Sequence, residues 1–261
     1  MDKYFQGKAL YGDDFNLKQI KEWYEDEKEG YSSLDESKRD YEFHALNKFH
    51  GFNKIPKDKK FSKALGLGSA YGYEFLPVIK RIKNLFIIEP SKRLRLRELY
   101  GKKINYRSPK PSGDIPFDDR SFDLICCFSV LHHIPNVSHV LSEMTRVTRK
   151  GGYILIREPT VSMGDWKKER KGVTKRERGI PLDLFREMIN KQNLEIVSER
   201  RILFPTTRRI KLFGRFACNM GFFVMIDYVF SKIFSFNKKY HAESSIDKLQ
   251  PQAVFYVLKK R

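Results

Sequence analysis

Cysteine is scarce in this sequence, and no hydrophobic run is long enough to cross a bilayer. The chain has three cysteines among 261 residues, and their positions lack the spacing of a zinc site or of a disulfide-rich domain. The longest uncharged stretch of its most apolar region, Phe216–Ile226, is too short to span a membrane. No basic and then apolar leader opens the chain. We therefore expect a cytoplasmic protein whose thiols are buried and reduced.

Acidic residues are also in deficit. The chain has 51 lysines and arginines against 32 aspartates and glutamates, which gives a formal net charge of +19. A charge of this size favours nucleic acid, anionic lipid or phosphorylated substrates as partners. The alternative is a lysine-rich, solvated surface. Nucleic acid is the weaker choice, because the basic residues are spread along the chain and no appended RNA-binding module is visible.

Apolar segments alternate with amphipathic ones from residue 61 onward, which predicts an α/β domain over residues 61–261. Uninterrupted apolar strands separated by helices indicate a parallel sheet that is covered on both faces. The predicted strands are 61–68, 85–88, 103–107, 122–128, 153–156, 194–204 and 253–258, and the predicted helices are 71–82, 91–100, 138–150 and 181–191. Residues 1–60 are predicted to form a helical arm, either a packing element or a lid over a pocket.

The segment 206–252 is predicted to be an insertion before the last strand. Its part from Leu212 to Phe236 is strongly apolar but is interrupted by charged residues such as Asp227 and Lys232. A buried helix is one interpretation. The other is an interfacial segment, in which residues 211–239 place aromatic side chains in an anionic membrane and lysines near its head groups. The second interpretation predicts peripheral contact with the inner face of the membrane.

The ends of the predicted strands carry the residues that suggest a ligand site. The first strand runs into a glycine-rich turn, residues 66–72. Such a turn allows close backbone approach and often holds a nucleotide-like ligand. The second strand ends at Glu89, whose carboxylate can accept hydrogen bonds from the two hydroxyls of a ribose. His132 and His133 follow the fourth strand, and Glu158 ends the fifth. In a parallel sheet these ends meet at one edge, so they predict a common pocket.

The order and spacing of these features over residues 61–160 resemble those of class I S-adenosylmethionine-dependent methyltransferases of the small-molecule group. The resemblance is carried by residues 115–125 (IPFDDRSFDLI), 131–134 (LHHI), 143, 146–147 and 150–156 (KGGYILI). It implies a Rossmann-like, doubly wound, seven-stranded sheet, mostly parallel with an antiparallel last strand. It also implies S-adenosyl-L-methionine as the cofactor and S-adenosyl-L-homocysteine as the product. A dinucleotide oxidoreductase is disfavoured, because Tyr71 stands where its Gly-x-Gly-x-x-Gly pattern requires the third glycine.

The resemblance assigns the cofactor site to the ends of the first, second and fourth strands and to the loop before the fourth. The residues that it implies are Gly66, Gly68, Ser69, Ala70, Glu89, Pro90, Asp114, Ile115, Ser129 and Val130. Gly68 and Ala70 are expected near the methionine moiety, Glu89 at the ribose, and the pair 114–115 at the adenine. The chain departs from the family pattern at Gly66, which stands where an acidic residue precedes the glycines, and at Ala70, which replaces a glycine.

A second, softer resemblance concerns the acceptor side. Residues 157–159 (REP), 162–166 (SMGDW) and 174–181 (TKRERGIP) are similar to those of methyltransferases associated with bacterial polysaccharide and lipopolysaccharide biosynthesis. The loop 160–181 is expected to cover the acceptor, where its tryptophan can stack on a sugar and its basic residues can bind a phosphate or carboxylate. A solvated charge run is the alternative. The predicted substrate-binding residues are Arg157, Asp165, Trp166, Arg170, Arg176 and Arg178.

A sugar hydroxyl is a poor nucleophile, so in-line methyl transfer to it is helped by a base within hydrogen-bond reach. His132 and His133 are the first candidates, because imidazole titrates in a suitable range, and Glu158 is the second. For either histidine, a structural hydrogen bond to the backbone is the alternative. No metal-binding set is visible in the sequence. We predict a methyltransferase that acts on a sugar hydroxyl of a glycan or nucleotide-sugar intermediate. An RNA methyltransferase and a non-catalytic binding protein on the same fold are the alternatives.

Overall fold

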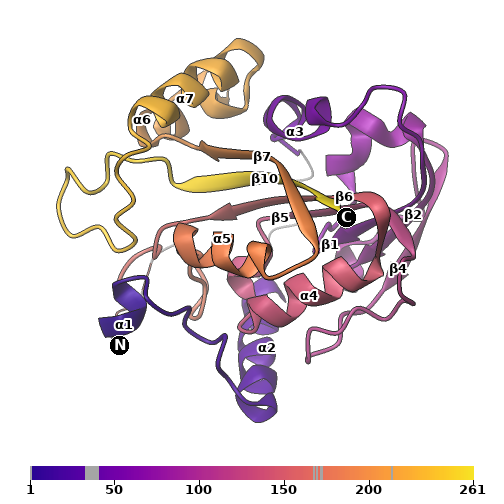
Figure 1. Cartoon of the computed structure of the whole chain (residues 1–261), viewed down its shortest axis with the longest axis horizontal. Coiled ribbons are helices and arrows are strands. Elements are labelled where there is room, and N and C mark those ends of the chain that lie inside the picture. Colours follow the sequence, from indigo (N-terminus) through magenta and orange to yellow (C-terminus); the bar gives the residue numbers. More distant parts are fainter. Residues whose placement is uncertain (1, 33–40, 167, 169, 171–172, 213) are drawn as a thin grey trace.

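The computed structural model describes residues 2–32, 41–166, 168, 170, 173–212 and 214–261. Its central feature is an eight-stranded sheet with helices on both faces (Figure 1). The strands are β1 (Phe61–Leu67), β2 (Ile82–Ile88), β3 (Glu98–Leu99), β4 (Lys102–Arg107), β5 (Phe122–Phe128), β6 (Thr148–Pro159), β7 (Leu194–Ile202) and β10 (Ala253–Lys260). Their order across the sheet is β3-β4-β2-β1-β5-β6-β10-β7.

Strand β1 lies inside the sheet and pairs in parallel with both β2 and β5. The pairs β2–β4 and β5–β6 are also parallel, whereas β10 runs antiparallel between β6 and β7. The chain therefore winds outward in both directions from β1, and the strand order reverses between β1 and β5. This architecture confirms the predicted Rossmann-like α/β fold with an antiparallel last strand. All seven predicted strands are present, and β3 is an additional one.

One predicted helix is wrong, and another is present as a 3₁₀ helix. Residues 91–100 form a short 3₁₀ turn at Lys92–Leu94 and then β3, which pairs antiparallel with β4. The side chain of Ser91 makes no capping hydrogen bond, so the predicted helix start is missing. The segment Tyr73–Arg81 is a 3₁₀ helix instead of an α-helix. It contains Pro77, which has no N–H to donate to a helical hydrogen bond.

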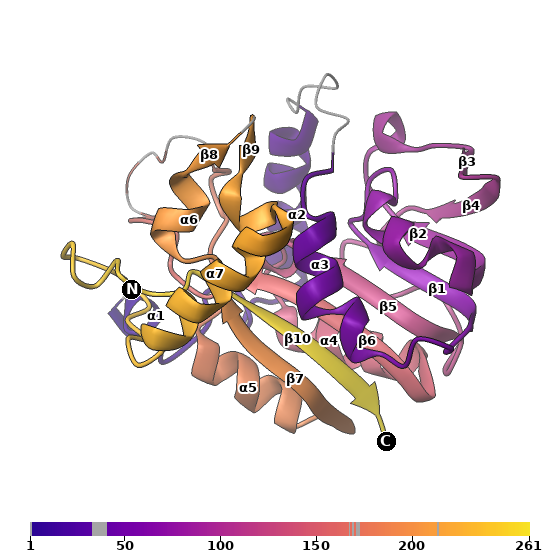
Figure 2. The same ribbon diagram turned by 90° about the horizontal axis from the view of Figure 1, so that it is seen from above.

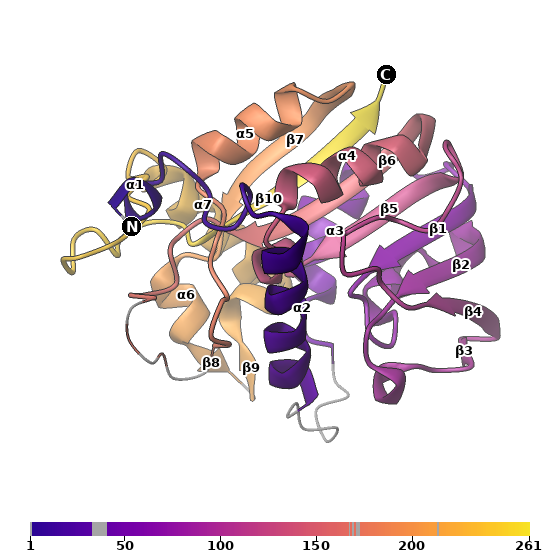
Figure 3. The ribbon, with the colours of Figure 1, turned by 90° about the horizontal axis from the view of Figure 1, so that it is seen from below.

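Helices cover the sheet in two layers, as Figures 2 and 3 show from opposite sides. Helices α4 (Val137–Val147) and α5 (Leu182–Asn190) pack on one face, and α3 (His44–His50), the 3₁₀ helix 73–81 and α7 (Gly221–Ile233) pack on the other. Strand β5 contributes to both layers, because Cys127 packs with α4 and α5 whereas Cys126 packs with the opposite layer. All three cysteines are free and buried.

The N-terminal arm meets the sheet at the carboxyl ends of its strands. This part of the arm contains α1 (Asp2–Phe5) and α2 (Leu17–Ser32), and α2 lies beside the ends of the central strands (Figure 3). Helix α3, which also falls within the predicted arm of residues 1–60, packs on a face of the sheet instead. Trp23 of α2 is fully buried, and its indole N–H donates to the carbonyl of His133 at 2.7 Å. This bond anchors α2 to the segment that follows β5. The lid function of the arm stays a prediction.

The insertion before β10 is a small helical unit. It contains α6 (Pro205–Arg209), the strand pair β8 (Lys211–Leu212) and β9 (Arg215–Phe216), and α7. Asp227 of α7 is fully buried, and its carboxylate accepts hydrogen bonds from the N–H groups of Leu203 and Phe204 and from the Thr207 hydroxyl. Within the described ranges, none of the helices combines the length and the apolar character that crossing a membrane requires.

We expect Asp227→Ala to destabilise the protein by about 2–3 kcal/mol, because it leaves buried backbone donors without an acceptor. Urea denaturation measures the change. Asp58→Ala, at an exposed position, is the matched control and should change the free energy of unfolding by less than about 0.5 kcal/mol. Equal unfolding midpoints for the two variants would contradict the structural role of Asp227.

Candidate active site

A pocket opens beyond the carboxyl ends of β1, β2 and β5, at the point where the strand order reverses. It is lined by Trp23, Tyr24, Glu27, Leu67, Gly68, Ile88, Glu89, Pro90, Pro109, Lys110, Pro111, Gly113, Asp114, Ile115, Val130, His133, Ile134, Pro135 and Val140. Six residues predicted to bind the cofactor are part of this lining, namely Gly68, Glu89, Pro90, Asp114, Ile115 and Val130. Of the other four, Gly66 lies within β1, and Ser69, Ala70 and Ser129 belong to the turns beside the pocket.

The turn after β1 requires glycine where the backbone is both left-handed and crowded. Gly68 has a φ of +55°, and a Cβ atom there would lie 2.7 Å from the side chain of Val130. Its N–H donates to the Ile88 carbonyl at 2.9 Å. Ala70 also has a positive φ, of +44°, and its carbonyl accepts a hydrogen bond from the Tyr106 hydroxyl at 2.9 Å. The turn is thereby fixed against β2 and β4, with Gly68 on the pocket wall.

Position 66 has no room for the acidic side chain of the family pattern. A Cβ atom on Gly66 would lie 2.2 Å from the Ser69 hydroxyl and 2.9 Å from the Phe75 ring. A buried acid, Glu74, follows the same turn and is hydrogen-bonded to Ser69. Burial raises the pKa of Glu74 to about 7. The region of the turn thus retains a carboxyl group, which the 3₁₀ helix supplies instead of the strand.

Glu89 is buried at the end of β2 and organises two neighbouring turns. Its carboxylate accepts hydrogen bonds from the N–H groups of Ala70 and Ser91, each at 3.0 Å. Burial raises the pKa of Glu89, and these two bonds oppose the rise. Each carboxylate oxygen can accept more than one hydrogen bond. Glu89 can therefore still accept a bond from a ligand hydroxyl in the pocket that it lines.

Two charged residues of α4 shape the loop that carries Asp114 and Ile115. Glu143 accepts a hydrogen bond from the Ile115 N–H, and Arg146 donates to the Ile115 carbonyl, both at 2.9 Å. The carboxylate of Asp114 is partly exposed and pairs with His139 at 2.9 Å. The acid and the arginine that helped to carry the resemblance are thus positioning residues for this wall.

The carboxylate of Glu158 holds the segment after β5. It is fully buried and accepts hydrogen bonds from the N–H groups of Val130 and Leu131 at 2.8 and 2.9 Å. Nδ1 of His132 lies 2.7 Å from the same carboxylate. These contacts make Glu158 a positioning residue, which differs from its predicted role as a base.

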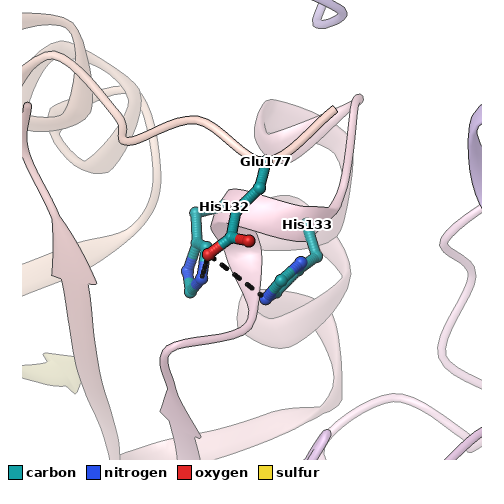
Figure 4. A group of neighbouring side chains, drawn as sticks. All are labelled: His132, His133 and Glu177. Carbon is teal, nitrogen blue, oxygen red and sulfur yellow. Dashed lines mark ion pairs between the residues drawn. The ribbon is translucent and has the colours of Figure 1, made fainter. Parts of the chain in front are cut away.

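His132 and His133 converge with a carboxylate that sequence analysis did not single out, Glu177 (Figure 4). Nε2 of His132 lies 3.3 Å from Oε1 of Glu177, and Nε2 of His133 lies 4.0 Å from it. On the other side of the rings, Nδ1 of His132 faces Glu158 and Nδ1 of His133 faces Glu27, both at 2.7 Å. Burial lowers the pKa of His132, but the carboxylates of Glu158 and Glu177 outweigh burial and raise it to about 9. His133 and Glu27 also line the pocket.

The arginines of the loop 160–181 bind groups of the protein itself. Arg178 is fully buried, and its five N–H donors are directed at five backbone carbonyls, those of Tyr11, Leu131, His132, Ile134 and Pro135. Arg170 donates to carbonyls of its own loop, and Arg176 pairs with Asp26 of α2 at 2.5 Å. The structure therefore gives Arg178 a positioning role in place of the predicted substrate contact.

The remaining predicted substrate residues lie outside the pocket lining. Arg157 is buried beneath α3, where it donates to Asn47 at 2.9 Å and lies over the Phe43 ring at 4.0 Å. Its carbonyl also accepts a hydrogen bond from the N–H of Ser129, whose φ is +61°.

Trp166 and Asp165 are placed at the arm and on the loop surface. The Trp166 ring stacks on Phe5 and Tyr11, with centroids 4.5 and 5.7 Å away, and Asp165 pairs with Lys168 at 3.8 Å. Substrate binding by these residues, and by Arg170 and Arg176, stays a prediction.

Glu27 and Glu177 are the site residues that sequence reasoning missed. Both reach the histidines through tertiary contacts, Glu27 from the arm and Glu177 from the loop 160–181. A weak signal was present on α2, where Trp23 and Glu27 are four residues apart and therefore share one helix face. Because Trp23 is apolar and expected to be buried, an acid on the same helix face is expected to contact the protein as well as solvent.

Comparisons with known proteins agree with this architecture. Residues 65–156 match the family model of a methyltransferase domain. The chain is 34% identical over 61 residues to phthiotriol/phenolphthiotriol dimycocerosates methyltransferase 1 of Mycobacterium ulcerans. The aligned stretch covers 23% of this chain and 22% of that protein. The chain is also 40% identical over 45 residues to demethylmenaquinone methyltransferase of Bacillus cytotoxicus, and this aligned stretch covers 17% of this chain and 19% of that protein. The chain thus spans about a fifth of the length of these curated relatives.

A solved structure with a similar fold covers nearly the whole chain. It is phosphoethanolamine N-methyltransferase 1 of Haemonchus contortus, in complex with phosphoethanolamine and S-adenosylhomocysteine. The TM-score is 0.58 at 11% identity, and the likeness covers 96% of this chain and 51% of that one. At this identity the likeness concerns the fold. Together, the family match and the fold confirm the predicted resemblance to class I methyltransferases.

We expect the stability of Glu74→Gln to depend less on pH than that of the natural chain. The pKa of Glu74 rises from 4.5 to about 7 on folding because of burial, so the folded state keeps a proton that the unfolded state releases. The natural chain therefore loses stability as the pH rises from about 4.5 through 7, by about 3 kcal/mol in total. The variant should gain by that amount relative to the natural chain between pH 5 and 8. Urea titrations across this range test the expectation.

Glu98→Gln, at an exposed position, is the control for this measurement. It should follow the natural chain at every pH. A constant difference between Glu74→Gln and the natural chain from pH 5 to 8 would show that Glu74 does not titrate in this range.

Proposed function

We propose that this chain, whose residues 65–156 match a methyltransferase domain and whose sheet has the class I fold, transfers the methyl group of S-adenosyl-L-methionine to a sugar hydroxyl. The acceptor is a sugar of a glycan or of a nucleotide-sugar intermediate. The observation that carries the cofactor assignment is the pocket at the reversal of strand order. There the glycine turn, Glu89 and the loop at Asp114 face one cavity. S-adenosyl-L-homocysteine is the expected product.

Each wall of the pocket suits one part of the cofactor. The backbone at Gly68 admits the close approach of the methionine moiety. The carboxylate of Glu89 accepts hydrogen bonds from ribose hydroxyls. The apolar side chains of Ile88 and Ile115, beside Asp114, suit the adenine. When bound, the cofactor supplies an electrophilic methyl group on a sulfonium, and the protein has to align the acceptor and remove its proton.

Helix α2 and the segment after β5 form the acceptor end of the pocket. Trp23, Tyr24 and Glu27 line it together with His133, and a mixture of aromatic and polar groups suits a ligand with both apolar faces and hydroxyls. His133 keeps its predicted role of accepting the hydroxyl proton, because it lines the pocket and the Glu27 carboxylate at Nδ1 fixes the orientation of its ring. His132 is not part of the lining, and the raised pKa of its imidazole suits it poorly to accept a proton at neutral pH. Glu158 positions the segment that carries both histidines through its hydrogen bonds to the Val130 and Leu131 N–H groups and its contact with Nδ1 of His132.

We expect isothermal calorimetry to detect binding of S-adenosylhomocysteine to the full chain and Glu89→Ala to weaken it by about 10- to 100-fold. A hydrogen bond to a charged group contributes about 1.5–3 kcal/mol. Glu98→Ala, at an exposed position, should bind like the natural chain. No heat at millimolar ligand would refute the cofactor assignment.

The same preparation tests the acceptor. Methyl transfer from labelled cofactor to a hydroxyl of lipid-linked or nucleotide-linked sugars is the expected result, and mass spectrometry locates the added methyl group. Transfer to RNA but to none of the sugars would favour the alternative RNA methyltransferase. Cofactor binding without transfer to any acceptor would favour a binding protein on the same fold.

The exposed face of α7 supports peripheral contact with an anionic membrane surface. Apolar side chains are exposed at a helical spacing on this face, whereas Asp227 and Ser231 point inward. The exposed set is Phe222, Met225, Val229, Phe230 and Ile233, with exposed fractions from 41% to 67%, and Phe236 follows it at 78%. Exposed basic residues lie in the last turn of the helix and on either side of it in the sequence, namely Lys232, Arg208, Arg209, Lys211, Lys238 and Lys239. Apolar groups bordered by cations suit the interface of an anionic bilayer.

We expect the chain to sediment with vesicles that contain phosphatidylglycerol and to stay in solution with vesicles of phosphatidylcholine alone. The double variant Phe222→Ser, Ile233→Ser should bind the anionic vesicles about 10-fold less, because it removes apolar area from the interface. Leu17→Ser, which replaces an exposed leucine of α2, is the control. Equal sedimentation of both variants would exclude α7 as the contact.

A further inference from the structure

We propose that His132, His133 and Glu177 bind a divalent transition-metal cation of the zinc type at the acceptor end of the pocket. Their ligand atoms, two imidazole nitrogens and one carboxylate oxygen, all lie within 4.8 Å of one another. The histidines come from the 3₁₀ turn Leu131–His133 after β5, and the acid comes from the loop 160–181. Figure 4 shows the three side chains directed at a common point.

The outer partners of both histidines match those of metal-binding histidines. Nδ1 of His132 lies 2.7 Å from Glu158, and Nδ1 of His133 lies 2.7 Å from Glu27. An Nδ1–H donated to a carboxylate leaves the lone pair of a neutral ring at Nε2, which is the atom directed at Glu177. This carboxylate–histidine arrangement is the common outer shell of protein metal sites. Here it occurs twice, with acids from two different elements.

The charges around the cluster favour a cation. Glu27, Glu158 and Glu177 are 5%, 0% and 9% exposed, so three carboxylates surround two imidazoles in a buried place. Buried carboxylates require a counter-charge or a metal ion. The nearby Arg178 and Arg176 direct their guanidinium groups at backbone carbonyls and at an aspartate of α2. Protonation of the imidazoles is the competing way to balance the charge, and the experiment below separates the two.

The donor set indicates the class of metal. Two imidazole nitrogens and one carboxylate oxygen suit zinc and its first-row neighbours, whereas magnesium and calcium prefer oxygen ligands alone. Bonds of about 2.0 Å place tetrahedral ligands about 3.3 Å apart. The pair His132–Glu177 already has this separation, at 3.3 Å, and His133 lies at 4.0 Å from the same oxygen. A small shift of the Glu177 and His133 side chains toward each other would complete the site.

Three protein ligands leave a fourth position for water or substrate, as in catalytic zinc sites. His133 lines the pocket, so that position lies at its acceptor end. This catalytic use rests on the proposed function: a hydroxyl bound there would lose its proton more readily. A nitrogen that binds the cation cannot also accept that proton, so with the cation bound the proton would pass to water in the pocket and not to His133.

The test is a cobalt and zinc titration of the full chain after removal of metals with a chelator. We expect one Co²⁺ per chain, with visible ligand-field absorption that Zn²⁺ abolishes. Glu27→Gln should weaken Zn²⁺ binding by about 10- to 100-fold, as replacing an outer-shell partner does. His133→Ala and Glu177→Gln should weaken it further. His139→Ala, which removes a histidine paired with Asp114 instead, should leave it unchanged.

Far-ultraviolet circular dichroism shows whether each variant is folded, and binding of S-adenosylhomocysteine to the same samples tests the proposed cofactor site. A chain that binds this ligand but neither metal at millimolar concentration overturns the inference and leaves the proposed function intact. Equal metal binding by the natural chain and the folded His133→Ala and Glu177→Gln variants also overturns it. A chain that binds one cation through these residues but no S-adenosylhomocysteine supports the inference and refutes the proposed cofactor.

Discussion

Two buried charged residues fix the segment after β5, one through its N–H groups and the other through its carbonyl groups. The Glu158 carboxylate accepts hydrogen bonds from the N–H groups of Val130 and Leu131, and Arg178 donates hydrogen bonds to carbonyls from Leu131 to Pro135. An irregular segment at the end of a buried strand has no sheet neighbours for these groups, and each unpaired one would be costly. Both ends of the pocket depend on this arrangement. Val130 packs against Gly68 at the cofactor end, and the histidines stand at the acceptor end.

The sheet and the cofactor side were predictable because their signals are local. Strand β5 was predicted with its exact bounds, since an uninterrupted apolar run of this length fits a strand buried on both faces. The glycine turn and Glu89 follow their strands directly, so the topology alone places them together. Strand β3 was missed for the opposite reason. It has only two residues and exists through its pairing with β4, whereas the sequence there shows a serine and basic residues that are also typical of a helix.

The acceptor side could be predicted only in part, because residue type does not reveal what a charge is bound to. Arg178 looks like an anion ligand in sequence, yet its donors are all directed at carbonyls. Arg157 and Glu158 were expected to share one site. Successive residues of a strand point to opposite faces, and Arg157 accordingly lies beneath α3 while Glu158 bonds the segment after β5. This divergence was predictable. The association of Glu27 and Glu177 with the histidines was not, because it depends on how the arm and the loop fold back.

Because the three cysteines are buried, their reactivity can report local opening of the structure. Cys126 and Cys127 are adjacent in β5 but face different layers, and Cys218 lies in the insertion. Burial raises the pKa of all three thiols, so the thiolate that an alkylating reagent needs forms only when the surrounding structure opens. The labelling rate of each thiol thus measures how often one region opens. Cys126 and Cys127 report the opening of the two layers that cover β5, and Cys218 reports the opening of the helical insertion. No probe has to be introduced, because all three cysteines belong to the natural chain.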